Sequence, residues 1–282
     1  MQIGGRVFEG RGPFLMGVVN VTPDSFSDGG RFLARDAALA EAERLGAEGA
    51  DLVDIGGEST RPGAPEVPPQ EEIGRVVPVI AALRARGFPL PISVDTRKAE
   101  VARAALAAGA DLVNDVSALG DPDMAGAVRD AGVPVVLMHM RGTPADMASR
   151  AVYGDVVAEV EAELRQAMAR AAAAGLPASR VVLDPGIGFA KTAEGSLRLL
   201  GGLSGMRRRL GRPLLVGPSR KSFIGKVTGA EVGDRLPGTL AAVAACVLAG
   251  VEFVRVHDVA AARQAARVAA AIRDATGSAA EG

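Results

Sequence analysis

Short apolar runs alternate with longer Ala-rich segments along almost the whole chain. The apolar runs have the length and β-branched content of buried strands, and the segments between them repeat apolar residues with helical spacing. About eight such pairs follow one another, which is typical of a parallel sheet with its helices outside. We predict helices over 36–49, 70–86, 97–108, 121–131, 152–174, 193–210, 237–249 and 259–275.

The apolar runs end abruptly in polar, turn-forming residues, for which a core strand has no structural need. An active site built from the carboxyl ends of strands does need them. The runs with their polar ends are LMGVVNVTPDSFSDGG (15–30), LVDIGGESTRPG (52–63), PISVDTRK (91–98), LVNDVS (112–117), VVLMHMRG (135–142), VVLDPGIGF (181–189), LLVGPSRKS (214–222) and FVRVHDV (253–259).

A chain of 282 residues has about the length of one α/β barrel, typically ~250 residues. We predict one domain over 1–282, a (β/α)8 TIM barrel with its core at about 14–275 and a short N-terminal hairpin. An open doubly wound sheet is the alternative, although no G-x-G-x-x-G follows the first strand. Three similar segments favour a ring of repeated units, since each places Gly to end a helix and then an acid before a strand: GADLVD (49–54), GADLVN (109–114) and GVEFVR (250–255).

The composition excludes several classes of partner. The net charge is −1 and no Lys/Arg cluster carries interleaved aromatic residues, so nucleic acid is not an expected partner. The longest apolar stretch, 240–251, is shorter than the ~20 residues of a membrane helix, so no membrane partner is expected. The single Cys246 excludes an intrachain disulfide, and with no signal peptide in view it predicts a cytoplasmic protein.

Several strand-end residues suit the recognition of a flat heterocycle. Residues i and i+2 of a strand share a face, so Ser93 and Asp95 point the same way, as do Arg255 and His257. Carboxylates, a carboxamide and a lysine from different strands can bind an amino-amide edge, while apolar side chains cover the ring. The alternative for the buried charges is a structural Arg–Asp pair at a barrel end. The candidates are Asp95, Asn114, Asp184 and Lys221 for the edge, with Met138 and Phe189 for the ring.

A second group of residues points to an anion. The loops at 59–63 and 219–222 follow strands, and the second opens a helix, whose free N–H groups favour phosphate. Arg255 and His257 end the last strand beside that place. Capping of the helix by the two serines of the second loop is the alternative. Oxygen ligands for Mg²⁺ held largely by a diphosphate come from Asn20, Asp24 and Asp28.

Seven motifs resemble, in order, those of the dihydropteroate synthase family and span about residues 14–260. They are NVTPDSFSDGG (20–30), DIGGESTRPGA (54–64), SVDT (93–96), NDVS (114–117), LDPGIGF (183–189), GPSRKSFIG (217–225) and RVHD (255–258). The resemblance implies a TIM-barrel transferase, a target of sulfonamide drugs, that joins 6-hydroxymethyl-7,8-dihydropterin diphosphate to p-aminobenzoate and releases pyrophosphate. It also implies a homodimer through outer helices, for which the apolar segment 239–251 could serve unless it faces the barrel.

The same resemblance implies a role for each matching residue. The pterin would bind Asp95, Asn114, Asp184 and Lys221, with Met138 and Phe189 against its ring. The diphosphate would bind Asn20, Arg61, Arg255 and His257, with Mg²⁺ on Asn20. The p-aminobenzoate would lie among Thr60, Arg61, Phe26, Ser219, Lys221 and Ser222. The catalytic residues would be Asp95, Lys221, Arg255, His257 and Asp28.

Two other functions are compatible with parts of the pattern. A pterin-binding methyltransferase domain, which passes a methyl group from methyltetrahydrofolate to a corrinoid protein, resembles this chain at Asp95, Asn114 and Asp184. It is expected to lack the STRPG and RKSFIG segments, because it handles no diphosphate. A non-catalytic paralogue is expected to have damaged loops, whereas these loops are intact.

Overall fold

The computed structural model describes residues 1–10, 12–21 and 30–278, and its centre is an eight-stranded parallel sheet in the order β8-β7-β6-β5-β4-β3-β10-β9. A bridge between Leu183 and Leu214 joins the two edge strands, so the sheet closes into a barrel. The predicted TIM barrel is confirmed and the doubly wound sheet is wrong. The strands are β3 (Phe14–Asn20), β4 (Leu52–Gly56), β5 (Ile92–Asp95), β6 (Leu112–Asp115), β7 (Val135–Met138), β8 (Val181–Asp184), β9 (Leu215–Val216) and β10 (Phe253–Val256).

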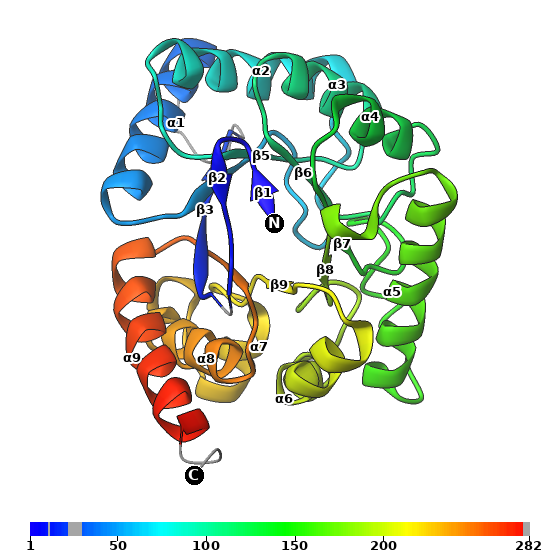
Figure 1. Ribbon diagram of the computed structural model, residues 1–282, viewed down its shortest axis with the longest axis vertical. Helices are drawn as coiled ribbons and strands as arrows, with labels where there is room; N and C mark the ends of the chain where they lie inside the picture. The colour runs from blue at the N-terminus through cyan, green and yellow to red at the C-terminus, as the bar shows by residue number, and fades with distance from the viewer. Residues whose placement is uncertain (11, 22–29, 279–282) are drawn as a thin grey trace.

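Helices follow the strands and form a ring around the barrel (Figure 1). In the second helix, for example, Val76, Val79, Ile80 and Leu83 form an apolar face that is buried in the core together with strand residues such as Val53 and Val94. None of the described helices is both long and apolar enough to cross a membrane. The helices are α1 (Gly30–Ala47), α2 (Pro69–Ala85), α3 (Ala99–Ala107), α4 (Met124–Ala131), α5 (Val156–Ala173), α6 (Ala193–Leu210), α7 (Ser222–Thr228), α8 (Leu236–Leu248) and α9 (Val259–Ser278).

The predicted N-terminal hairpin, β1 (Gln2–Ile3) and β2 (Arg6–Val7), lies across the amino-terminal opening of the barrel (Figure 1). Its Ile3 and the following Phe8 are buried against one apolar layer of strand residues. That layer consists of Met16, Leu52, Leu112, Val136, Val182, Leu215 and Phe253.

The candidate site residues lie two positions further along the same strands. Because side chains alternate across a strand, the residue two positions after each residue of the apolar layer also faces the barrel interior. The interior therefore changes from apolar at the plugged end to polar at the carboxyl end. The pairs are Leu52 with Asp54, Leu112 with Asn114, Val136 with Met138, Val182 with Asp184, and Phe253 with Arg255.

The three similar segments noted in the sequence share one structural role at the closed end. Gly49, Gly109 and Gly250 all have positive φ, as a helix-ending glycine requires. The acid that follows each one accepts a hydrogen bond from the first residues of a neighbouring strand. These bonds join Asp51 Oδ2 to Leu15 N (2.8 Å), Asp111 Oδ2 to Ile92 N (2.8 Å) and Glu252 Oε2 to Leu214 N (2.9 Å).

Candidate active site

An ion-paired cluster fills the carboxyl end of the barrel. Arg255 donates from Nε to Asp54 Oδ2 (2.6 Å) and from Nη2 to Asp95 Oδ2 (2.8 Å). Asn114 donates from Nδ2 to the same Asp54 oxygen (3.0 Å). The structural Arg–Asp pair considered above therefore exists, and it lies at the open end of the barrel among the strand-end residues.

Asp54 was missed as a site residue by the sequence reasoning, although its motif was recognised. It is fully buried in the middle of β4. The signal was available, since Leu52 and Asp54 have the same spacing as Phe253 and Arg255.

Several buried acceptors of the cluster have no hydrogen-bond partner within the described residues. Such atoms are costly when buried unless a donor reaches them, so they indicate where a donor-rich ligand fits. They are Asp54 Oδ1, Asp95 Oδ1, Asn114 Oδ1 and Ser93 Oγ.

Burial shifts the charges of the site toward neutrality. It raises the pKa of Asp95 to about 7, against the attraction of Arg255, and it raises the pKa of Asp184 to about 6. It lowers the pKa of Lys221 to about 8, helped by the nearby charge of Arg255. Groups that titrate this close to neutral pH are typical of functional sites.

An apolar wall borders the cluster on the β7 and β8 side. Lys221 Nζ lies 3.9 Å from the centre of the Phe189 ring, a cation–π contact. Met138 is buried at the end of β7. The structure thus brings the six residues proposed for a heterocycle to one end of the barrel: Asp95, Asn114, Asp184, Lys221, Met138 and Phe189.

Ser219 and His257 form a second pair, beside the cluster. Ser219 Oγ lies 2.9 Å from His257 Nδ1 and also accepts from the His257 backbone N–H (3.3 Å). Burial and the positive charge of Arg255 lower the pKa of His257 to about 3, so its ring is neutral. Helix capping does not explain the serines, because Lys221 is the N-cap of α7 and no side chain caps it; Ser222 is exposed at the first helical position.

The loop after β4 carries Thr60 and Arg61, and Glu58 ties the start of this loop to Lys98 and to Val67 near its end. Glu58 accepts from Lys98 (3.0 Å) and from the backbone N–H of Val67 (2.9 Å). Arg61 is exposed, and no hydrogen bond within the described residues joins its side chain to the cluster. Asn20 is exposed at the end of β3, while Asp24, Phe26 and Asp28 lie outside the described residues.

A buried network beneath the loop after β8 was not foreseen from the sequence. Lys191 Nζ donates to the backbone oxygen of Phe189 (2.8 Å) and lies 2.9 Å from His139 Nδ1. His139 Nε2 in turn lies 2.8 Å from Glu163. Burial lowers the pKa of His139 to about 4 and that of Lys191 to about 7. The network fixes the backbone that carries Phe189.

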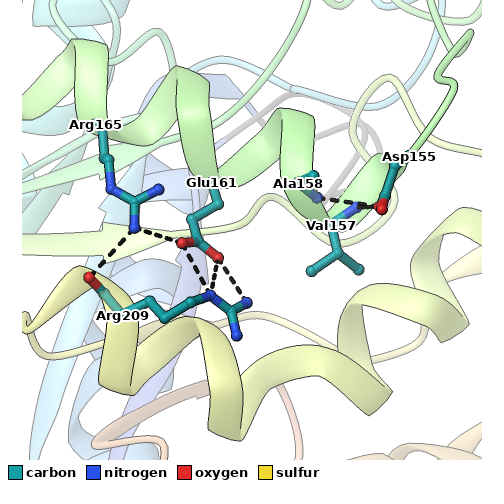
Figure 2. A pocket seen from close by; sticks show the side chains of 6 residues that line it. All are labelled: Asp155, Val157, Ala158, Glu161, Arg165 and Arg209. Atoms are coloured by element: carbon teal, nitrogen blue, oxygen red, sulfur yellow. Dashed lines mark hydrogen bonds and ion pairs between the residues drawn. The ribbon is translucent and has the colours of Figure 1, made fainter.

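A surface hollow of about 290 Å³ between α5 and α6 is a poorer candidate (Figure 2). Its Glu161 carboxylate is already bonded by Arg165 (2.5 Å) and Arg209 (2.8 Å), and Asp155 caps the start of α5. With these charges paired to one another, the hollow presents no group in need of a ligand.

Comparison with known proteins decides the family. The model of the family described as pterin binding enzyme matches residues 16–257. The dihydropteroate synthase of Synechocystis sp. is 45% identical over 275 residues, which cover 96% of this chain and 94% of that protein. The chain belongs to the dihydropteroate synthase family. It is therefore a transferase of folate biosynthesis, and the methyltransferase and non-catalytic alternatives are wrong.

Solved structures of the family agree with the observed fold. The Yersinia pestis dihydropteroate synthase, solved with a sulfonamide drug complex, has a TM-score of 0.91 and 41% identity, covering 97% of this chain and 99% of that one. The Xanthomonas albilineans dihydropteroate synthase, solved in complex with 7,8-dihydropteroate, has a TM-score of 0.84 and 47% identity, covering 93% and 94%.

Proposed function

We propose that this chain joins 6-hydroxymethyl-7,8-dihydropterin diphosphate to p-aminobenzoate at the carboxyl end of the barrel, giving 7,8-dihydropteroate and pyrophosphate. The unpartnered acceptors of Asp95 and Asn114 carry this proposal, because the amino-amide edge of a pterin presents a row of N–H donors. Asp184 adds a further carboxylate to bind that edge, while Lys221 and Phe189 border the ring. The dihydropteroate-bound relative supports the ligand class.

The reaction is proposed to be a dissociative substitution at the pterin methylene carbon. The bond from that carbon to the diphosphate oxygen breaks first, and Arg255, His257 and Arg61 stabilise the departing charge. The cation left behind is delocalised into the dihydropterin ring, where the Asp95 carboxylate favours it together with Asp28, which lies outside the described residues. The arylamine nitrogen then forms the new bond to carbon and releases its proton to pyrophosphate or solvent. Water would compete with the arylamine for the cation, so the site must exclude water during the reaction.

The donor set fits Mg²⁺ held mainly by the substrate. Mg²⁺ commonly takes one or two protein oxygens and completes its shell with phosphate oxygens and water. The exposed Asn20 amide at the end of β3 provides one such oxygen, and the described residues contain no group of three or more His, Cys, Asp or Glu that would form a cage. When bound there, Mg²⁺ would offset negative charge on the diphosphate.

The arrangement of the chain also enters the proposal. We propose that 1–282 acts as one domain, since the βα units run from β3 to α9 around one barrel. We propose a homodimer through α7, α8 and α9, because these helices and the segment between α7 and α8 carry several exposed large apolar side chains. We also propose a cytoplasmic location, in keeping with the free, buried Cys246. The exposed apolar residues on and between these helices are Val227, Val232, Leu248, Val268 and Ile272.

The test of the proposed reaction follows pyrophosphate release from the dihydropterin diphosphate with Mg²⁺, with and without p-aminobenzoate. Release that is matched by dihydropteroate formation supports the proposal. Pterin binding without any product would contradict it. A protein that releases pyrophosphate equally fast without p-aminobenzoate would be a hydrolase, which also contradicts it.

A further inference from the structure

One buried carboxylate touches both halves of the proposed site. Asp54 is fully buried on β4, and its Oδ2 accepts from Arg255 Nε (2.6 Å) and from Asn114 Nδ2 (3.0 Å). In the sheet, β4 lies two strands from β10, which carries Arg255, and two strands from β6, which carries Asn114. Asp54 thus joins side chains from opposite flanks of the same opening.

These two bonds fix how each partner is turned. Arg255 has a planar guanidinium, and Asp54 and Asp95 hold two of its nitrogens. Asp95 is slightly exposed and, in the proposed complex, shares its oxygens with the pterin donors, whereas Asp54 is fully buried and its Oδ2 accepts from Arg255 and Asn114. For Asn114, donation from Nδ2 to Asp54 turns Oδ1 away, and that oxygen is one of the unpartnered acceptors.

We infer that Asp54 is a positioning residue, which aims Arg255 at the diphosphate and the Asn114 oxygen at the pterin. This inference rests on the proposed function of the site. It predicts that loss of the Asp54 charge weakens recognition of the diphosphate more than recognition of the pterin, because Arg255 loses its permanent counter-ion and Asn114 loses only one hydrogen bond.

The chain supplies a matched control three residues earlier. Asp51 is also buried and also pairs with an arginine, Arg263 (2.7 Å), but it lies at the closed end of the barrel. Asp51→Asn and Asp54→Asn therefore make the same chemical change in two buried, arginine-paired carboxylates, one just before β4 at the closed end of the barrel and one within β4 near the open end. A purely structural role for Asp54 would make the two variants alike.

The test measures the affinities of the folded variants for inorganic pyrophosphate and for 6-hydroxymethylpterin, together with kcat and KM. Asp54→Asn is expected to weaken pyrophosphate binding and to lower kcat on the order of 100-fold, with a smaller loss of pterin affinity. Asp51→Asn is expected to lower the melting temperature and leave both affinities unchanged. Asp54→Glu keeps the charge and should lose less pyrophosphate affinity, and it serves as the test should Asp54→Asn fail to fold.

Three results are decisive against the idea. Wild-type pyrophosphate affinity in Asp54→Asn or Asp54→Glu would overturn the positioning role. Equal losses of pyrophosphate and pterin affinity would overturn it too, since Asp54 would then stabilise the whole site and not the orientation of Arg255 in particular. A wild-type protein that binds neither ligand would overturn the proposed function, and the inference with it.

Discussion

Asp95 lies between Arg255 and the place proposed for the pterin, and its charge should matter most when the pterin becomes a cation. Asp95→Asn keeps the size of the side chain and removes the charge. By analogy with the loss of one oxyanion-hole donor, kcat should fall about 10²–10³-fold. Steady-state kinetics check this, with the exposed Asp130→Asn as control. A kcat near that of the wild type would exclude Asp95 from catalysis.

The charge states of the site predict a bell-shaped pH dependence of pterin binding. Burial raises the pKa of Asp184 to about 6 and that of Asp95 to about 7, so these carboxylates take up protons as the pH falls through this range and lose acceptor capacity. Burial lowers the pKa of Lys221 to about 8, so the ammonium loses its charge above that pH. Titration calorimetry with 6-hydroxymethylpterin from pH 5 to pH 9, corrected for ionisation of the free ligand, measures both limbs.

Lys221→Met separates the two groups. The variant should lose the alkaline limb and keep an acid limb, which should move to higher pH because the Lys221 charge no longer lowers the pKa of Asp184. An alkaline limb that survives in Lys221→Met would assign it to another group, such as Lys191, whose pKa burial lowers to about 7.

Single residues also mark where sequence reasoning stops. The polar residues of PISVD and FVRVHD were placed by period-two alternation, and the same rule applied to LVDIG would have found Asp54. Its partner could not have been found this way. Asp54 and Arg255 are 201 positions apart in the sequence, and they meet because the last strand, β10, pairs with β3, which in turn pairs with β4. The same holds for Lys191 and His139, which the chain brings together from two different loops.

At the scale of strands and helices, local sequence signals predicted whether a segment is a helix or a strand better than they predicted the residues at which it begins and ends. The segment 152–174 was predicted as one helix, whereas α5 begins at Val156, where the Asp155 side chain accepts from Val157 N and Ala158 N. The apolar pattern simply continues upstream through Val152 and Tyr153, and an N-cap outweighs it. The sequence left open whether the apolar segment 239–251 faces the barrel or a second subunit. The structure buries its Val243, Cys246 and Val247 in the core, while Leu248 is exposed.

The acids that precede the strands should set the stability of the closed end. Asp111 accepts from the N–H of Ile92 (2.8 Å) and is paired with Arg84, so Asp111→Ala leaves that N–H without its acceptor and Arg84 without its counter-ion. The free energy of unfolding should fall by about 2–4 kcal/mol. Thermal and urea unfolding measure this, and Asp130→Ala, an exposed pair with Arg129, should change little. Equal stability of both variants would deny these acids a role in holding strand ends.

At the scale of the whole molecule, the fold was predictable because every local level agreed with it. Strand alternation, helix spacing, helix-ending glycines and polar strand ends all require the same ring of βα units. The subunit arrangement, in contrast, could not be predicted from these local patterns. It depends on which helix faces remain exposed after the helices pack, and at this side of the barrel α8 packs against α9 (Figure 1).

The face formed by α7, α8 and α9 leads to the last prediction, that the protein is a dimer whose contact can be broken there. Leu248 and Val268 are exposed apolar residues of α8 and α9, and buried aliphatic side chains in a dimer core would not tolerate a charge. Light scattering coupled to gel filtration should give twice the 28.7 kDa chain mass for the wild type and one chain mass for Leu248→Glu with Val268→Glu. Val152→Glu, which changes a still more exposed residue just before α5 on the other side of the helix ring, should remain dimeric. A wild-type monomer would contradict the dimer. A double variant that stays dimeric would place the subunit contact on another face.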